Sequence, residues 1–216
     1  MRLDIFTLIP GAFEWIRERR PVAAVLGNGL ELNVFNYRDT TPLSAGQVDD
    51  EPYGGGRGMV LRVDVVSAAF QAVYGGVPGN RVVALSPAGR LLDQELVEEL
   101  AAEPALTLLS ARFEGFDQRI LDHLSTDAVS IGPYVLSGGE IPALAVVDAV
   151  VRRLPGALTE GSGEVESFSA ALNGGLEYPH YTRPADFLGW QVPEVLLSGD
   201  HGRIAAWRQE RVRTVA

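Results

Sequence analysis

Strand-like apolar runs alternate with helix-like segments through the first 154 residues of this chain. In the helix-like segments, apolar residues recur every three or four positions. We expect strands at 2–8, 30–37, 81–85, 105–110 and 128–131, and helices at 13–20, 64–74, 93–102, 117–124 and 141–154. Short buried strands that alternate with helices are typical of a largely parallel sheet, so the sequence predicts an α/β fold.

The pattern changes after Pro155. Residues 159–163 read Thr-Glu-Gly-Ser-Gly, a composition typical of a flexible connector. One further helix is expected near the end of the chain, with Asp200 as its N-cap. We therefore expect a main α/β domain at 1–158, a flexible linker at 159–175 and a short helical domain at 176–216.

Composition narrows the class of protein. Of the 216 residues, 46% are hydrophobic and 21% charged, which is typical of a soluble globular protein. No apolar run reaches the roughly 18 residues of a membrane span, and the N-terminus lacks a signal-peptide layout, so we expect a cytoplasmic protein without a membrane partner. The net charge of −10 argues against general binding to DNA or RNA, although an arginine-lined groove remains compatible with it.

Several chemistries are excluded by missing residue types. All 18 basic residues are arginine, so a P-loop lysine and Schiff-base catalysis are impossible. There are no cysteines, which excludes disulfides and thiolate metal sites. The three histidines are scattered without zinc-ligand spacing, and we expect no protein-held metal site. Neither the glycine fingerprint of a dinucleotide site nor a serine nucleophile elbow is present.

Three predicted strands end in unusual loops. The strand ending at Leu85 continues into Ser-Pro-Ala-Gly-Arg, and the strand ending at Ser110 into Ala-Arg-Phe-Glu-Gly. The third continues into residues 130–140, Ser-Ile-Gly-Pro-Tyr-Val-Leu-Ser-Gly-Gly-Glu, which offers mostly backbone groups to a ligand. Because ligands bind beyond the carboxyl ends of parallel strands, the three loops predict one small-molecule cleft. Taken alone, residues 130–140 are equally compatible with a plain structural turn.

A second candidate segment places acidic residues before a glycine-rich loop. Residues 48–59 read Val-Asp-Asp-Glu-Pro-Tyr-Gly-Gly-Gly-Arg-Gly-Met. Carboxylates repel phosphate but accept hydrogen bonds from the N–H groups of a base such as guanine. The alternative is a solvated acidic turn.

Six segments together resemble one family, the bacterial tRNA (guanine-N1)-methyltransferases (TrmD) of the SPOUT superfamily. In family order, they are residues 49–59, 85–90, 112–119, 130–140, 178–184 (Tyr-Pro-His-Tyr-Thr-Arg-Pro) and 192–201 (Val-Pro-Glu-Val-Leu-Leu-Ser-Gly-Asp-His). The resemblance implies a SPOUT-type parallel sheet with a C-terminal trefoil knot, and a homodimer with active sites at the subunit interface. It also implies S-adenosylmethionine as the methyl donor, N1 of guanosine 37 in tRNA as the acceptor, and an assisting magnesium ion.

The resemblance also assigns roles to individual residues. Asp49 and Glu114 match residues that contact the target guanine, and Arg152 matches an arginine that stabilises charge on guanine O6. Glu166 stands where the family has its general base, an aspartate before Ser-Phe. The donor-binding positions match Leu85, Ser86, Pro87, Ala111, Ile131, Gly132, Tyr134, Leu136, Gly138 and Gly139.

This chain also departs from the family pattern. Glu166 is one methylene longer than the usual aspartate, Ala111 replaces a glycine, and Pro133 replaces an aspartate. The chain ends at Ala216, earlier than family members do, so we expect a divergent and C-terminally short member. Two alternatives stay open: the same donor with another RNA or a small molecule as acceptor, and a binding module without enzymatic activity. Arg152 is also compatible with a solvated position at a helix C-terminus.

Overall fold

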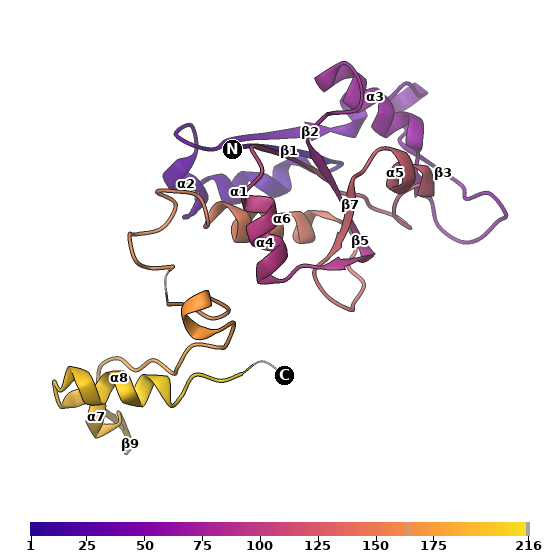
Figure 1. Cartoon of the computed structure of the whole chain (residues 1–216). Coiled ribbons are helices and arrows are strands. Elements are labelled where there is room, and N and C mark those ends of the chain that lie inside the picture. The colour runs from indigo at the N-terminus through magenta and orange to yellow at the C-terminus, as the bar shows by residue number, and fades with distance from the viewer. Residues whose placement is uncertain (164, 215–216) are drawn as a thin grey trace. The chain divides into compact units, whose positions relative to one another are not determined.

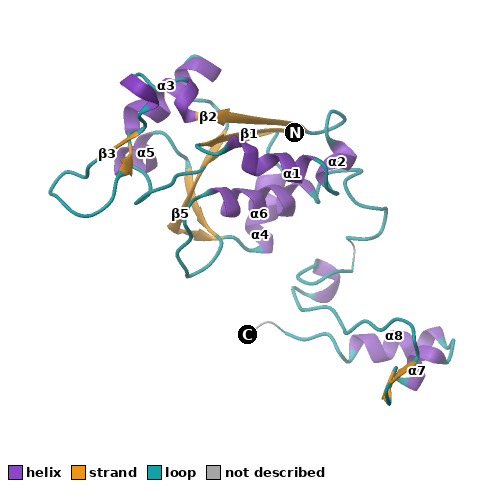
Figure 2. Cartoon of the chain, turned by 180° about the vertical axis from the view of Figure 1, so that it is seen from behind, coloured by secondary structure: helices purple, strands orange, loops and turns teal. Residues whose placement is uncertain are grey.

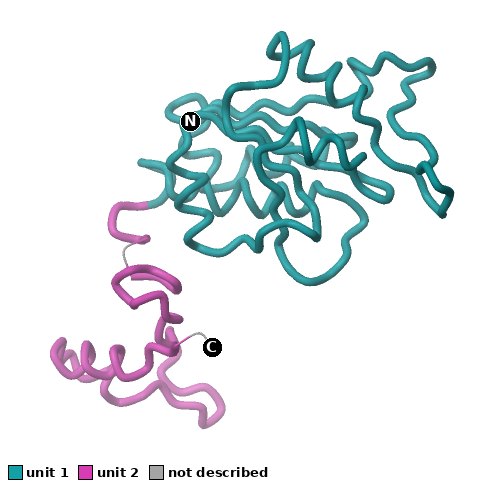
Figure 3. The backbone as a smooth tube through the Cα atoms, turned by 45° about the vertical axis from the view of Figure 1, so that its right-hand side comes forward, with its two compact units in different colours: residues 1–158 teal, residues 159–216 magenta. Residues whose placement is uncertain are grey.

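The computed structural model describes residues 1–163 and 165–214. The chain divides into two compact units, residues 1–158 and 159–216 (Figure 3). Residues 159–175, which the sequence predicts to be a flexible linker, fall within the second unit, where residues 170–172 form a short 3-10 turn.

A five-stranded sheet forms the centre of the first unit (Figure 1). Its strand order is β2-β1-β6-β5-β7, and each neighbouring pair is parallel. The strands are β1 (Arg2–Thr7), β2 (Glu31–Asn36), β5 (Arg81–Leu91), β6 (Ala105–Leu109) and β7 (Asp127–Ser130). This arrangement confirms the predicted α/β class with a parallel sheet.

Helices cover both faces of this sheet (Figures 1 and 2). One face is covered by α1 (Glu14–Arg17), α2 (Val22–Val25), α4 (Gln94–Ala101) and α6 (Glu140–Val151). The other face is covered by α3 (Val63–Tyr74) and α5 (Gln118–His123). Short 3-10 turns lie at Pro10–Phe13, Tyr37–Asp39 and Ser44–Gly46, and a small ribbon pairs β3 (Asp49–Asp50) with β4 (Val60–Leu61).

The two cores follow from the alternation of side chains along the strands. In β1, Leu3 and Ile5 pack into the cluster beneath α1, α4 and α6, whereas Phe6 packs against Phe70 of α3 on the opposite face. Successive strand residues point to opposite faces, so a sheet buried on both sides needs apolar residues at nearly every position. Each fully buried side chain of this size stabilises the fold by about 1.5–3 kcal/mol.

Two predicted helices begin or end elsewhere. The helix expected at 13–20 is α1, which ends at Arg17 shortly before Pro21, where the chain cannot continue an α-helix. The helix expected to begin at Asp64 begins one residue earlier. Asp64 lies in its first turn and pairs with Arg62 at 2.8 Å instead of capping it.

Strand β5 continues past the predicted end at Leu85. Val129 of β7 pairs with both Leu85 and Arg90, so residues 86–89 leave the sheet and the strand then rejoins it. The expected loop is present, but it is an excursion within one strand. Gly89 makes this return possible, because a Cβ at that position would overlap the backbone of Ala128 and Val129.

The described part of the second unit contains the α-helices α7 (Glu194–Leu197) and α8 (His201–Gln209). The side chain of Asp200 accepts a hydrogen bond from the Arg203 N–H at 3.0 Å, as predicted for the N-cap of α8. A hairpin of β8 (Asp186–Phe187) and β9 (Trp190–Gln191) was not predicted, because each strand is only two residues long. Among the described residues, no helix is long and apolar enough to span a membrane.

We expect Gly89→Ala to destabilise the first unit by about 1–3 kcal/mol, because the added methyl group meets β7 backbone that cannot easily move. Gly79→Ala is the matched control, since a Cβ there meets no atom within 4 Å. Urea unfolding of both variants measures the difference. Equal stability of the two variants would show that the return of β5 to the sheet does not need glycine.

Candidate functional site

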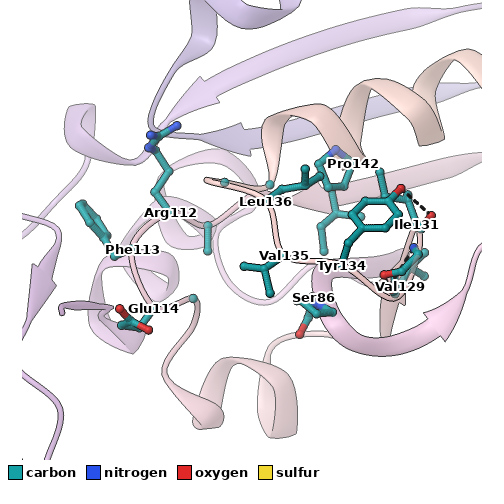
Figure 4. Close-up of a pocket in the computed structure, with 18 residues that line it drawn as sticks. Ser86, Arg112, Phe113, Glu114, Val129, Ile131, Tyr134, Val135, Leu136 and Pro142 are labelled. Carbon is teal, nitrogen blue, oxygen red and sulfur yellow. Dashed lines mark hydrogen bonds between the residues drawn. The ribbon is translucent and has the colours of Figure 1, made fainter. Parts of the chain in front are cut away.

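A cavity of about 170 Å³ lies at the carboxyl ends of β5, β6 and β7 (Figure 4). Its walls come from the β5 excursion, from the segment after β6 and from the loop between β7 and α6. The three loops that the sequence indicated therefore meet at one edge of the sheet. This edge is where parallel α/β proteins bind small ligands.

The structure brings all ten predicted donor-binding residues together in this cavity. They are Leu85, Ser86, Pro87, Ala111, Ile131, Gly132, Tyr134, Leu136, Gly138 and Gly139. Sequence reasoning did not single out several other lining residues, namely Arg112, Phe113, Gly115, Val129, Ser130, Val135 and Pro142. Except for Pro142, which lies in the first turn of α6, these residues lie in or close after the predicted strands, and that position is the signal that could have identified them.

The first half of the β7–α6 loop forms a tight turn around Gly132. Ser130 Oγ donates to the Gly132 carbonyl oxygen at 3.1 Å, and the Tyr134 hydroxyl donates to the Ile131 carbonyl oxygen at 3.0 Å. A Cβ on Gly132 would overlap the Tyr134 ring. Glycine is therefore needed for the ring to fold back against the loop, where Figure 4 shows it beside Ile131.

The second half of this loop is held against the end of β6. The Gly139 N–H donates to the Ala111 carbonyl oxygen at 2.7 Å, and Ser110 Oγ donates to the Gly139 carbonyl oxygen at 3.1 Å. A Cβ on Gly139 would lie 2.8 Å from Ser110 Cα, closer than real Cβ atoms approach. Gly139 thus permits the chain to cross in contact with β6 before α6 begins.

Between these two anchors, Val135, Leu136 and Gly138 line the cavity. Within the described chain, the N–H groups of residues 135–138 make no backbone hydrogen bond. Backbone polar groups require a partner when they are buried. A bound ligand would bury and satisfy them, so the loop is suited to a ligand that is recognised through the main chain.

Charge is sparse around the cavity. Among its described lining residues, only Arg112 and Glu114 carry a charge. The remaining lining is glycine, proline, aliphatic and aromatic residues with two serine hydroxyls. Such a lining suits a largely apolar ligand whose polar edges are bound by backbone groups.

Glu114 connects this cavity to the acidic segment. Its N–H donates to the Met59 carbonyl oxygen at 2.9 Å, and the Leu61 N–H donates to the Gly115 carbonyl oxygen at 3.0 Å. Leu61 pairs in turn with Asp49 across the β3–β4 ribbon. Asp49 is therefore held close to the cavity wall, although it is not itself a lining residue.

The neighbouring acids and arginines pair with one another. Arg62 contacts Asp50 and Asp64, each at 2.8 Å, and Arg119 contacts Asp117 at 2.6 Å. The hydrogen bonds from Arg62 and from Arg119 hold the pKa of Asp64 and of Asp117, respectively, below its usual value. These five side chains line a wider hollow of about 940 Å³ beside the ribbon.

The two predicted catalytic residues belong to different units, Arg152 to the first and Glu166 to the second. Arg152 is the C-cap of α6, and a rise of 1.5 Å per residue places it about 20 Å along the helix axis from Gly139, the N-cap that lines the cavity. Glu166 is partly exposed and belongs to the second unit, where its carbonyl oxygen accepts the Ser169 N–H at 3.0 Å.

Resident metal binding finds no support in the described residues. Among them, no three histidine, aspartate or glutamate side chains gather as metal ligands. Mg²⁺ prefers several oxygen ligands in octahedral geometry. The side chains present therefore do not fit a magnesium ion held by the protein alone.

Comparison with known proteins identifies relatives along the whole chain. Residues 1–216 match the family described as tRNA (Guanine-1)-methyltransferase TrmD. A tRNA (guanine-N(1)-)-methyltransferase of Brevibacillus brevis is 48% identical over 96% of this chain and 85% of its own length. A protein of the same name from Geobacillus kaustophilus is 45% identical over 97% of this chain and 86% of its own length. One from Dehalococcoides mccartyi is 44% identical over 97% of this chain and 85% of its own length. The chain therefore belongs to the tRNA (guanine-1)-methyltransferase family.

Proposed function

We propose that this protein transfers a methyl group from S-adenosylmethionine to N1 of guanosine 37 in tRNA. The carrying observation is the weakly charged, backbone-lined cavity at the ends of β5, β6 and β7. Its ten residues at the family's donor-binding positions come from three separate loops. Curated relatives that cover nearly the whole chain carry the name of this activity.

The cavity fits the methyl donor in its chemistry. S-adenosylmethionine presents an adenine edge with donors and acceptors, for which the free backbone groups of residues 135–138 are suited. Leu85, Ile131 and Leu136 offer apolar contacts to its rings. The donor supplies an activated methyl group on a sulfonium, whose charge disappears on transfer. A weakly charged lining therefore does not oppose the reaction.

The acceptor requires a base, because guanine N1–H is a weak acid that must lose its proton as the new bond forms. We assign this role to Glu166, whose carboxylate accepts the N1 proton. The guanidinium of Arg152 stabilises negative charge that develops on O6. The carboxylates of Glu114 and Asp49 accept hydrogen bonds from guanine N–H groups and hold the base in place.

The position of Arg152 supports a homodimer. Helix α6 places Arg152 about 20 Å along its axis from Gly139 in the wall of its own cavity, so its guanidinium reaches a reacting guanine most simply in the cavity of a second copy. We propose such a dimer. A trefoil knot of the SPOUT type is also proposed, supported by the parallel sheet and by the close crossing of Gly139 over the end of β6.

Other predictions from the sequence stay predictions. These are the flexible linker at 159–175, the helical domain at 176–216 and the cytoplasmic location. A magnesium ion is assigned no step, because the described side chains do not form its cage. A different acceptor and a non-enzymatic binding module are the alternatives that the next experiment separates from the proposed activity.

An unmodified tRNA transcript with guanosine at position 37 is expected to take up labelled methyl from S-adenosylmethionine, with the label at N1. A transcript with adenosine at that position should take up none, because it lacks the acidic N1–H. Scintillation counting measures the uptake of label, and nucleoside analysis identifies the methylated position. Labelling of both transcripts would point to another acceptor, and cofactor binding without labelling would point to a binding module.

Glu166→Gln should bind S-adenosylmethionine as tightly as the parent chain and lose about 10²–10⁴-fold in the rate of methyl transfer, because an amide cannot accept the N1 proton. Glu160→Gln, an exposed change in the same unit, is the matched control. Calorimetry and single-turnover kinetics provide the two measurements. Full turnover by Glu166→Gln would assign the base elsewhere.

Mixing two inactive variants tests the dimer. In Gly139→Ala the added methyl group displaces the cavity wall from the end of β6, and in Arg152→Ala the guanidinium is lost. If Arg152 acts in the partner's cavity, mixed dimers contain one intact cavity facing an intact arginine, and activity returns after co-refolding. If Arg152 serves its own cavity, each cavity in the mixture has a defect and activity stays absent.

A further inference from the structure

Glu140 is a buried carboxylate that the proposed chemistry does not use. It is the first residue of α6, directly after the glycine pair that lines the cavity, and only 6% of its surface is exposed. An ionised carboxylate in such a position costs stability unless fixed partners surround it. The residues that contact the Glu140 carboxylate therefore indicate its structural role.

Two segments from distant parts of the chain contact this carboxylate. Thr7, at the end of β1, donates through Oγ1 to Glu140 Oε1 at 3.0 Å in a buried hydrogen bond. Arg112, in the segment after β6, lies with Nη1 3.5 Å from Glu140 Oε2. Thr7 is itself fixed, because its Oγ1 accepts the Ile9 N–H at 3.0 Å.

The glycine turn of the cavity rests directly on this group of side chains. A Cβ on Gly138 would overlap Glu140 Oε2 and lie 3.1 Å from Arg112 Nη1. The backbone of Gly138 is therefore packed against the Glu140–Arg112 pair, of which Arg112 also lines the cavity. Any movement of the carboxylate moves the wall that faces the ligand.

A buried phenol adds to the polar surroundings. The Tyr37 hydroxyl is fully buried and has no hydrogen-bond partner among the described residues. Burial first, and the negative charge of Glu140 second, raise the pKa of this hydroxyl well above its usual value. The phenol thus stays neutral beside the charge of Glu140.

We propose that Glu140 is a positioning residue for the methyl donor: it joins the end of β1 to Arg112 and thereby sets the position of the Gly138–Gly139 wall. The donor's identity rests on the proposed function. Glu140 is not among the residues that line the cavity, so it acts on donor affinity through the loop. Glu140 does not affect the methyl-transfer step itself, because that step depends on groups at the guanine.

The test is Glu140→Gln, which keeps the shape and the acceptor for Thr7 but removes the charge that holds Arg112. A hydrogen bond to a charged group typically accounts for about 10- to 100-fold in an equilibrium constant. We expect the Kd and KM for S-adenosylmethionine to rise about tenfold or more. At saturating donor, kcat and the KM for tRNA should stay within about twofold of the parent values, because the guanine contacts are untouched.

Thr7→Val provides a second and independent variant, since it removes the hydrogen bond and keeps the β-branched shape. It should weaken donor binding in the same direction. In the double variant with Glu140→Gln, the two effects should be less than additive, because both changes act through one carboxylate. If Glu140→Gln fails to fold, Thr7→Val decides alone: a raised Kd with an unchanged kcat supports the proposal.

Asp148→Asn is the matched control, because it removes an exposed carboxylate from the same helix. Donor affinity at the parent level in Glu140→Gln, or in Thr7→Val where that variant decides, overturns the positioning role. A fall in kcat with unchanged donor affinity also overturns it. Failure of the parent chain itself to bind S-adenosylmethionine is a different result, which refutes the proposed function.

Discussion

The contact between Gly139 and the end of β6 is the constraint on which the cavity depends. Two backbone atoms there approach so closely that a single methyl group would force them apart. The hydrogen bond from the Gly139 N–H to the Ala111 carbonyl oxygen uses that proximity. It starts α6 at a defined point and holds the preceding loop at the edge of the cavity. The shape of the cavity therefore depends on the close contact of Gly139 with the end of β6.

The α/β class and most elements of the first unit were predictable from local pattern. Strands buried on both faces have nearly continuous apolar sequences, and Asp93, Asp117 and Asp200 each accept a backbone N–H at the start of a helix, as such residues commonly do. The return of β5 at Arg90 was not predictable in this way. Its cause is the fit of Gly89 against another strand, which is a tertiary contact without a local signature.

The candidate site likewise has a part that local sequence pattern predicts and a part that it does not. The residues predicted to bind the donor lie next to the strand ends that the sequence predicts, so topology alone places them at one edge of the sheet. The roles predicted for Arg152 and Glu166 come from family resemblance alone. The Thr7–Glu140–Arg112 group joins residues separated by up to 133 positions, with no periodic pattern to reveal it. A buried carboxylate at the first residue of a helix is recognised only when its surroundings are visible.

The excursion of residues 86–89 has a consequence for how the family can vary. Because β5 pairs with Val129 both before and after the excursion, the register of the sheet is independent of the number of residues between the two pairings. Insertions or deletions in this short stretch would reshape one wall of the cavity while the strands on either side keep their partners. The glycine turn before α6 has no such freedom, because its length is set by contacts at both ends. Among family members, we therefore expect differences in length to be common at residues 86–89 and rare in the glycine turn before α6.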